Sequence, residues 1–468
     1  MPANQRAGTI HRRAVGLALS LGVIFPAVIP VPVAASTAPS VIRFSTRDRS
    51  GKPMNCARFR AMQSNGHLER GQNDTLVDPV SLQVLKMAPL SCSTSRGSSI
   101  ELNRPVSPAS LTLAWPSAAG TSMIVLDLSR ASRRSVTAFE EVVAEQSVVD
   151  LQETRRAVAT TDAVPIAITQ SLRSMRTATT AAARAVRAWQ VWDLAASETL
   201  RVLTVAGSAP DRRTATWSGV TFDTLAITDQ RWSNARAATG SGGWVRVVMD
   251  RDEPASSYRA ILDRAHAEHL RVLGQFLDSS QMASVPLVEW RARVDNYVAA
   301  LPDADAWEVG NEVNGNWLGS SAAEKTTYAA RAVRSCCPSA RTMVTVLWNL
   351  GEDTSQDSMF SWLARAAINW NDIDDIGISL YPEDHPMGTA YNRVVTTLHR
   401  ALPQQRLLVS ELGYGNADLG HTWWWGSRDS VAAARTSVAR LYDAASRAHP
   451  FSGGGTFWWY FLAEGDVR

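Results

Sequence analysis

Lysine is scarce in this chain of 468 residues, because it occurs only at positions 52, 86 and 325 and nearly all of the 47 basic residues are arginine. A Schiff-base aldolase needs a reactive lysine, and an enolase-type enzyme needs a lysine or histidine base beside metal-binding carboxylates. Lys325 lies in a predicted helix at 322–334, so the sequence disfavours both classes. The net charge of +3 is too small to indicate a nucleic-acid partner.

Cysteine is also rare, with four residues, as expected for an exported protein that does not depend on disulfides. No Cys/His spacing indicates a metal site, so we expect neither a metal nor a cofactor. Cys56 and Cys92 lie in one β-rich region, and we favour a disulfide between them over two free thiols. Cys336 and Cys337 fall between a predicted helix and a predicted strand, where we expect a structural role or burial.

Long apolar runs are missing after the N-terminal region. Arg12 and Arg13 precede an apolar run at 14–25, and small residues at 33–35 supply a cleavage site. Residues 1–35 therefore predict a signal peptide and a secreted, extracellular protein. An uncleaved membrane anchor is the alternative, although prolines interrupt the run. No later segment is apolar enough to span a bilayer, so we expect no further membrane association.

Residues 41–133 are predicted to form a small β-rich domain. Extended apolar runs at 110–115 and 123–128 flank a turn signal, and 41–45 and 57–62 are weaker strand candidates. We expect a structural domain here, with a carbohydrate-binding module as the alternative.

Residues 134–206 are predicted to form a helical hairpin. Apolar and small residues recur there at three- and four-residue steps, which places them on one helical stripe. These residues are Leu172, Met175, Thr179, Ala182, Val186 and Trp189. The barrel pattern that follows has no helix after its last strand, so an apolar flank would be exposed. We expect the hairpin to cover that flank through Trp189 and Trp192.

Strands and helices alternate over residues 215–462, which is the pattern of a parallel sheet. Eight strands over about 250 residues are typical of a (β/α)8 TIM barrel, whose active sites lie at the carboxyl ends of the strands. The fold class is therefore α/β, a TIM barrel preceded by the β-rich domain and the helical hairpin. The predicted strands lie near 217–223, 244–250, 270–277, 305–311, 342–348, 375–381, 406–411 and 454–461.

Two glutamates end the fourth and seventh predicted strands. Glu312 lies in the segment 307–315 and Glu411 in the segment 407–414, each after an apolar run and before a glycine-containing loop. About 100 residues separate them, or roughly three βα units of about 30 residues each, so both should face the barrel mouth. One carboxylic acid and one carboxylate flanking a sugar bond are what glycoside hydrolysis requires.

At these residues the C-terminal half of the chain resembles the clan A glycoside hydrolases. In that clan the glutamate of an Asn-Glu pair ending strand four is the acid/base, and a glutamate ending strand seven is the nucleophile. Asn311-Glu312 and Glu411 match those positions. The resemblance implies a retaining glycoside hydrolase that cleaves an oligo- or polysaccharide by double displacement. The loop at 313–315 lacks the proline often found in the clan, and no clear histidine precedes Tyr381, which leaves the substrate open.

Other residues match further positions of the clan. Arg246 on strand two matches an arginine that contacts the nucleophile, and Tyr381 on strand six matches a tyrosine that hydrogen-bonds it. Asn311 matches the asparagine that binds the sugar 2-hydroxyl. Simpler roles compete, since Arg246 is also able to pair with Glu308 inside the barrel and Tyr381 to cap its strand.

Tryptophan is frequent, with 17 residues, and several follow or end barrel strands, namely Trp317, Trp348, the run at 423–425, Trp458 and Trp459. Flat indole rings suit the apolar faces of sugars, and a strand-eight tryptophan matches a stacking residue of the clan. Side chains of consecutive strand residues point in opposite directions, so only one of Trp458 and Trp459 is expected to meet the sugar. For the others, core packing competes with substrate contact.

Three aspartates end the first three predicted strands, at Asp223, Asp250 and Asp278. Each is placed to bind a sugar hydroxyl or to cap the helix that follows it. The sequence leaves both roles open.

A non-catalytic carbohydrate-binding barrel at the cell surface is the main alternative function. It would use the same tryptophans, but it gives no reason for two opposed glutamates. A purely structural surface protein is the third possibility, which the N-terminal half alone would allow.

Overall fold

The structure is a computed structural model that describes residues 41–64, 74–93, 99–117, 120–131, 136–209, 217–351, 357–382, 387–414, 431–459 and 461–464. All of these residues lie within one compact unit of the chain, Pro39–Arg468. The predicted signal peptide at 1–35 lies outside the described residues. Among the described helices, none combines the length and the apolarity needed to cross a membrane.

Eight parallel strands close into a barrel in the order β10-β11-β12-β13-β14-β15-β16-β9. Every predicted barrel strand is present within a few residues of its expected place, so the predicted TIM-barrel fold class is confirmed. The strands are β9 (Gly219–Phe222), β10 (Trp244–Val248), β11 (Arg271–Gln275), β12 (Ala306–Gly310), β13 (Arg341–Leu347), β14 (Asp375–Leu380), β15 (Arg406–Leu412) and β16 (Ser452–Trp458).

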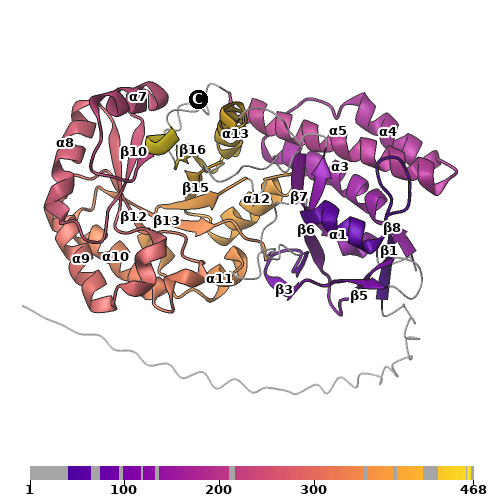
Figure 1. Cartoon of the computed structure of the whole chain (residues 1–468), viewed down its shortest axis with the longest axis horizontal. Helices are drawn as coiled ribbons and strands as arrows, with labels where there is room; N and C mark the ends of the chain where they lie inside the picture. Colours follow the sequence, from indigo (N-terminus) through magenta and orange to yellow (C-terminus); the bar gives the residue numbers. More distant parts are fainter. Residues whose placement is uncertain are drawn as a thin grey trace, which may run out of the picture. The chain divides into compact units, whose positions relative to one another are not determined.

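Helices alternate with these strands and cover the outside of the barrel, as Figure 1 shows for α7, α8, α9 and α10. Val245 and Val247 of β10 belong to the apolar layer between strands and helices, whereas Trp244 of the same strand lies in the interior cluster. The helices are α7 (Asp229–Thr239), α8 (Arg259–Ala267), α9 (Leu287–Ala300), α10 (Ala322–Cys336), α11 (Met359–Arg365), α12 (Tyr391–Ala401), α13 (Val431–Ser446) and α14 (Phe461–Glu464). Short 3-10 helices precede or follow some of them, at η1 (Ala255–Tyr258), η2 (Ser279–Ser284), η3 (Asn316–Leu318) and η4 (Trp370–Asp372).

The barrel interior has an apolar floor and a polar layer. The floor is a cluster in which the rings of Trp217 and Trp244 stack at 4.0 Å and Phe457 packs beside them. The floor includes Trp244 of β10 and Ala306 of β12. Two residues further along each strand, the buried side chains are Arg246 and Glu308. Because inward positions recur every second residue, these charges lie one layer closer to the carboxyl ends of the strands than the floor does.

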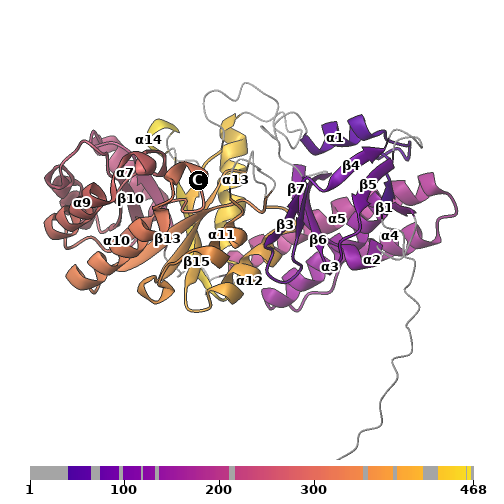
Figure 2. The same ribbon diagram turned by 90° about the horizontal axis from the view of Figure 1, so that it is seen from below.

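The described strands between residues 41 and 138 form two four-stranded sheets, in the orders β4-β5-β1-β8 and β3-β2-β6-β7. Helices α1, α3 and α5 pack on them, and Figure 2 shows these helices beside the strands. The strands are β1 (Val41–Ser45), β2 (Thr75–Val77), β3 (Val84–Met87), β4 (Leu90–Ser93), β5 (Ser99–Asn103), β6 (Ser110–Ser117), β7 (Gly120–Asp127) and β8 (Val136–Ala138), with the short helix α2 (Leu128–Ala131) after β7.

The strand predicted at 57–62 is wrong, because this segment lies in helix α1 (Cys56–Ser64). The side-chain oxygen of Asn55 accepts a hydrogen bond from the backbone N–H of Arg58 at 2.8 Å, which caps the first turn of the helix. The helix places Phe59 fully inside the core of the two sheets. Local capping and one buried aromatic side chain therefore outweigh the strand-like composition.

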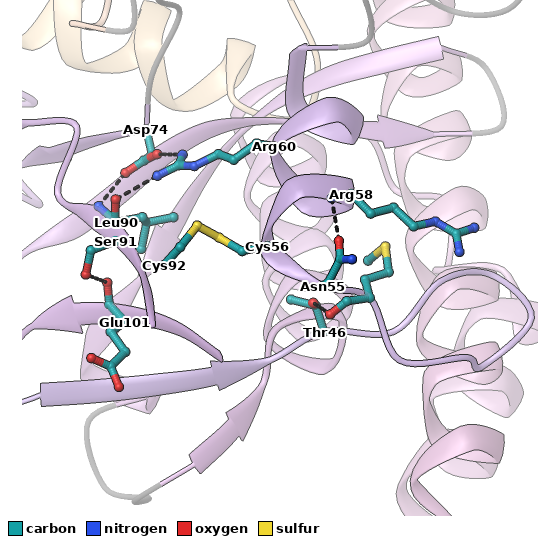
Figure 3. The surroundings of a disulfide bond; sticks show 11 residues. Thr46, Asn55, Cys56, Arg58, Arg60, Asp74, Leu90, Ser91, Cys92 and Glu101 are labelled. Atoms are coloured by element: carbon teal, nitrogen blue, oxygen red, sulfur yellow. Dashed lines mark hydrogen bonds and ion pairs between the residues drawn. A yellow bond between two sulfur atoms is a disulfide. The ribbon is translucent and has the colours of Figure 1, made fainter. Parts of the chain in front are cut away.

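The predicted disulfide between Cys56 and Cys92 is present and joins α1 to β4, with Cα atoms 5.8 Å apart (Figure 3). Beside it, Arg60 pairs with Asp74 and donates to the carbonyl of Leu90 at 2.6 Å. The two links fix α1 against the same sheet edge. Cys336 and Cys337 are bonded to each other at the end of α10, before β13.

The segment predicted as a helical hairpin contains three helices, α3 (Phe139–Ala157), α4 (Ile166–Thr177) and α5 (Ala181–Gly207). The predicted stripe crosses a break, because Ala178 is extended and the Thr180 side chain caps α5 by accepting from Ala183 N–H at 3.1 Å. Because the Thr180 hydroxyl accepts a backbone N–H of the first turn of α5, a new helix begins here and α4 does not continue into it.

Helix α5 packs against α13 of the barrel, but not through the predicted tryptophans. A Cβ added at Gly207 would lie 1.6 Å from the carbonyl oxygen of Ala444, so only glycine permits this approach. Trp189 instead stacks on Trp115 at 5.0 Å, and Trp192 belongs to the same core of the two sheets. The expectation that these tryptophans cover the barrel flank is therefore wrong.

Candidate active site

Glu312 and Glu411 both lie at the carboxyl ends of barrel strands. Glu411 is inside β15 and Glu312 follows β12, and their exposed fractions are 3% and 8%. Glu312 has a φ of 47°, a left-handed conformation that costs a residue other than glycine on the order of 1–3 kcal/mol. The surrounding loop holds this backbone, because Val313 N–H donates to the carbonyl of Thr345 at 3.0 Å and Gly315 N–H to that of Glu312 at 2.7 Å.

Glu411 is surrounded by donors from three βα units, Arg246 in β10, Tyr381 just after β14 and Asn311 just after β12. Arg246 Nη2 lies 3.0 Å from its Oε2, and the Tyr381 hydroxyl donates to its Oε1. The side-chain amide of Asn311 approaches Oε2 at 3.5 Å. A carboxylate with a guanidinium and a phenol as partners is favoured in its ionised form.

Glu312 has different partners. Ser279 Oγ donates to its Oε2 at 2.8 Å, and Ser379 Oγ donates to its Oε1 at 2.7 Å. Both donors are neutral hydroxyls, so they stabilise a negative charge less than the guanidinium beside Glu411 does.

One strand pair brings the two glutamates together. Ser379 of β14 is the register partner of Glu411 on β15, and its hydroxyl reaches Glu312. Asn311 links the same groups from the other side, since its Oδ1 accepts from Ser279 N–H at 3.1 Å and its amide points to Glu411. The two carboxyl groups therefore share neighbours on both sides.

Beneath the glutamates, Arg246 also pairs with the fully buried Glu308, at 2.7 Å from Nε to Oε2. Thr345 donates to Glu308 at 2.5 Å, and the amide of Asn311 donates to it at 3.1 Å. The pairing of Arg246 with Glu308, which the sequence offered as an alternative to contact with Glu411, thus coexists with that contact. Glu308 orients the arginine and the asparagine that both reach Glu411.

Glu312 and Glu411 are both buried, and burial disfavours the ionised form of each carboxyl group. Burial raises the pKa of Glu312, and the charge of Asp278 adds to this effect while the two serines and Arg246 oppose it. Burial raises the pKa of Glu411 to about 8, against the opposing influence of Arg246 and with a further rise from Glu312. Because Glu411 has the direct arginine contact, we assign the first ionisation of the pair to Glu411.

Trp458 and Trp459 point to opposite sides of β16. Trp458 is 3% exposed and belongs to the apolar layer between strands and helices. Trp459 lies with its ring 4.9 Å from the guanidinium carbon of Arg246, on the side of Glu411. Of the two predicted substrate contacts, the structure therefore brings only Trp459 to the glutamates, which corrects the assignment of Trp458.

The remaining predicted site residues lie at the rim or in the core. Trp317 is half-buried in η3, in the loop after β12. Asp278 accepts from Ser280 N–H at 2.9 Å and so caps η2, which is the capping role that the sequence left open. Trp348 is fully buried and stacks with Tyr391 at 6.2 Å, as core packing requires. The tryptophans at 423–425 lie outside the described residues.

Sequence reasoning missed the serines at Glu312. Ser379 of β14 precedes Tyr381, the residue after that strand, by two positions, so the period of two places both side chains on the inner face. That signal was present, but it did not say which glutamate each side chain reaches. Ser279 follows the capping Asp278, and no local pattern indicates that its hydroxyl turns inward.

Within the ranges that the structure describes, no group of three His, Cys, Asp or Glu side chains is placed to hold a metal ion. The chemistry that the site offers is that of two carboxyl groups with unequal donors and an aromatic ring beside them.

No protein-family model and no curated protein matches the chain. Among solved structures, a GH10 structure from Paenibacillus barcinonensis is similar, with 14% identity over 55% of this chain and 90% of that chain, at a TM-score of 0.40. The Ignisphaera aggregans GH53 catalytic domain is also similar, with 20% identity over 55% of this chain and 83% of that chain, at a TM-score of 0.36. A GH10 xylanase from Bispora sp. MEY-1 with xylobiose is similar as well, with 15% identity over 55% of this chain and 86% of that chain, at a TM-score of 0.40. Likeness at this level does not establish an activity, so the function rests on the site itself.

Proposed function

We propose that the chain is a retaining glycoside hydrolase that cleaves an oligo- or polysaccharide, with Glu312 as acid/base and Glu411 as nucleophile. The observation that carries this proposal is the unequal surroundings of two adjacent buried glutamates at the barrel mouth. Glu411 has the charged donor Arg246, and Glu312 has only the hydroxyls of Ser279 and Ser379 as direct donors among the described residues. Two carboxyl groups whose surroundings separate their protonation are what this chemistry uses.

In the first step, an oxygen of the Glu411 carboxylate attacks the anomeric carbon while the glycosidic C–O bond breaks. Glu312 gives its proton to the leaving oxygen. In the second step, the Glu312 carboxylate takes a proton from water, the water oxygen bonds to the anomeric carbon, and Glu411 leaves as a carboxylate. Each glutamate ends the cycle in its starting state.

Other residues of the site bind or orient in this proposal. Arg246 and Tyr381 hold the oxygens of Glu411, and Asn311 has its amide between Glu308 and Glu411, where a sugar 2-hydroxyl would meet it. Trp459 supplies a ring for the apolar face of the sugar. Trp317 and Asp278 are proposed as rim contacts for the substrate on either side of Glu312.

Product stereochemistry tests the proposal. We expect a glycan panel to reveal a substrate whose product, followed by proton NMR from the first minutes, keeps the anomeric configuration of the bond cleaved. The carboxyl groups should then lie about 5–5.5 Å apart, since a nucleophile must reach the anomeric carbon without an intervening water. An inverted product would contradict the mechanism. Binding of glycans without any turnover would favour the carbohydrate-binding barrel instead.

We also propose that the protein is exported and that residues 1–35 are removed. Support comes from the basic start, the apolar run and the small residues at 33–35. Mass spectrometry of the protein recovered from its host should find an N-terminus close to residue 36. A full-length chain retained in membranes would instead support the anchor.

A further inference from the structure

The carboxyl group of Glu312 lies between two serine hydroxyls that come from different segments of the barrel. Ser279 lies where β11 passes into η2, and Ser379 lies in β14. Their hydroxyls reach Oε2 and Oε1 of Glu312 at 2.8 and 2.7 Å, so each oxygen has one donor. The serines are 5% and 0% exposed, which removes competition from bulk water.

The backbone around Ser279 fixes that serine. Its own N–H donates to Asn311 Oδ1 at 3.1 Å, so one residue holds both members of the Asn-Glu pair. Helix η2, which begins at Ser279, is capped by Asp278 at one end. At the other end Lys325 Nζ donates to the carbonyl of Met282 at 2.7 Å. The single lysine of the barrel thus supports the segment that carries Ser279.

Ser379 is fixed by the sheet. Its carbonyl accepts from Trp348 N–H at 2.9 Å, and it is paired in register with Glu411. Its hydroxyl is therefore aimed from the strand next to the proposed nucleophile towards the proposed acid. A side chain in a central strand has little freedom to move away.

The charged groups around Glu312 act mostly in one direction. Asp278 on the η2 side opposes its ionisation and Arg246 on β10 favours it, and the repulsion between Glu312 and Glu411 on β15 acts on the pair. Glu308 pairs with Arg246, and the Tyr381 hydroxyl donates to Glu411. With more anions than cations nearby, an acid without neutral donors would keep its proton too firmly to release it.

We propose that Ser279 and Ser379 are positioning residues that hold Glu312 in the orientation for proton donation and stabilise its carboxylate once the proton has left. This inference rests on the proposed function, because it assigns the serines to the acid/base of that reaction. A hydroxyl that donates to a carboxylate stabilises the ionised form, so losing it raises the pKa of the carboxyl group. A serine with a purely structural role would change stability without changing proton affinity at Glu312.

Carbon NMR of the full chain tests the inference without any substrate. Glutamate labelled at the side-chain carboxyl carbon is titrated, and the Glu312 signal is assigned by its loss in Glu312→Gln. We expect Ser279→Ala and Ser379→Ala each to increase the proton affinity of Glu312 about tenfold, with a larger increase in the double variant. The matched control is Ser147→Ala, which removes a fully buried hydroxyl on α3 that donates to the Ala144 carbonyl, and it should change nothing.

Kinetics then tests the role. On a substrate with a poor leaving group, the alkaline limb of kcat/KM should move to higher pH in both serine variants and kcat should fall about tenfold or more. On an activated aryl glycoside the first step should change little. An unchanged or lowered proton affinity of Glu312 in both folded variants would overturn the inference. Failure of the proposed function is a separate result, namely full activity in Glu411→Gln.

Discussion

The surroundings of the two glutamates differ although both end barrel strands within one mouth. Glu411 is held by a guanidinium, a phenol and an amide from three βα units. Glu312, whose own backbone is strained, is held by two serine hydroxyls. Burial opposes ionisation of both groups, so the difference between them arises from the donors. The comparison shows how a near-symmetric pair of carboxyl groups is given two roles by its neighbours.

The largest expected effect comes from removing Glu411, the carboxyl group of the pair to which the donors assign the first ionisation. Glu411→Gln keeps the shape of the side chain but has no oxyanion to attack the anomeric carbon. We expect kcat/KM to fall about 10⁴-fold or more on every substrate, activated or not. Hydrolysis rates of an aryl glycoside and of the natural glycan measure this. Retention of full activity on either substrate would show that the site is elsewhere.

Glu312→Gln should behave differently and depend on the leaving group. We expect a loss of about 10²- to 10⁴-fold on a substrate whose leaving oxygen needs a proton, and a much smaller loss in the first step on an activated aryl glycoside. Added azide should speed the second step, because it attacks without base assistance. Equal losses on both substrates, with no azide effect, would mean that Glu312 is not the acid/base.

Arg246→Met tests the charge balance beneath the pair. It leaves Glu308 and Glu411 buried without their cation, which should lower the free energy of unfolding by about 3–5 kcal/mol. The control is Arg236→Met, because Arg236 forms an exposed ion pair with Glu268 at 3.2 Å and should contribute at most about 1 kcal/mol. Urea unfolding of the two variants measures the difference. Equal losses would contradict the role of Arg246 as the shared cation.

The pH dependence of stability sharpens the comparison. A carboxyl group whose pKa is raised on folding contributes stability at low pH, and this is lost as pH rises through the folded value, which is about 8 for Glu411. The free energy of unfolding should therefore fall between about pH 5 and pH 8 in the wild type, and fall less in Glu411→Gln. Asp150 and Glu140, whose pKa values burial also raises to about 7, act in the same direction in both proteins. Identical slopes would show that folding does not change the proton affinity of Glu411.

The smallest effect on catalysis is expected at the two tryptophans of β16. Trp459→Ala removes the ring over Arg246 and should lower kcat/KM on the order of tenfold, or about 1.4 kcal/mol. Trp458→Ala should instead lower stability by about 3–5 kcal/mol, since that ring fills the outer core, and leave kcat/KM of the folded protein nearly unchanged. If Trp458→Ala lowered kcat/KM and Trp459→Ala lowered only stability, Trp458 would be the substrate contact and Trp459 the core residue.

The barrel was predictable from the sequence because its strands are apolar, evenly spaced and separated by helical stretches. The same regularity located Glu312 and Glu411 at strand ends, where side chains from distant segments meet. Strand alternation predicted that only one of Trp458 and Trp459 faces inward, but the choice needed the register of β16. Which donor reaches which glutamate depends on side-chain directions from four strands, so Ser279 and Ser379 carried no distinctive local signal.

The N-terminal part was less predictable because local capping decides its elements. Asn55 turns the segment after it into helix α1, and Thr180 divides a continuous apolar stripe into α4 and α5. Trp189 and Trp192 have the spacing of a surface that covers a neighbour. That spacing does not say whether the neighbour is the barrel or the two N-terminal sheets. In the structure the partner of Trp189 is Trp115, which belongs to the sheets.

The central claim, that Glu411 is the nucleophile and Glu312 the acid/base, is tested most directly by trapping the glycosyl enzyme. The full chain is incubated with activated 2-deoxy-2-fluoro glycosides of several sugars, digested, and the labelled peptide sequenced by mass spectrometry. We predict one covalent glycosyl ester, on Glu411, formed also in Glu312→Gln when the leaving group is activated and absent in Glu411→Gln. A label on Glu312, or on a residue outside the barrel mouth, would contradict the account.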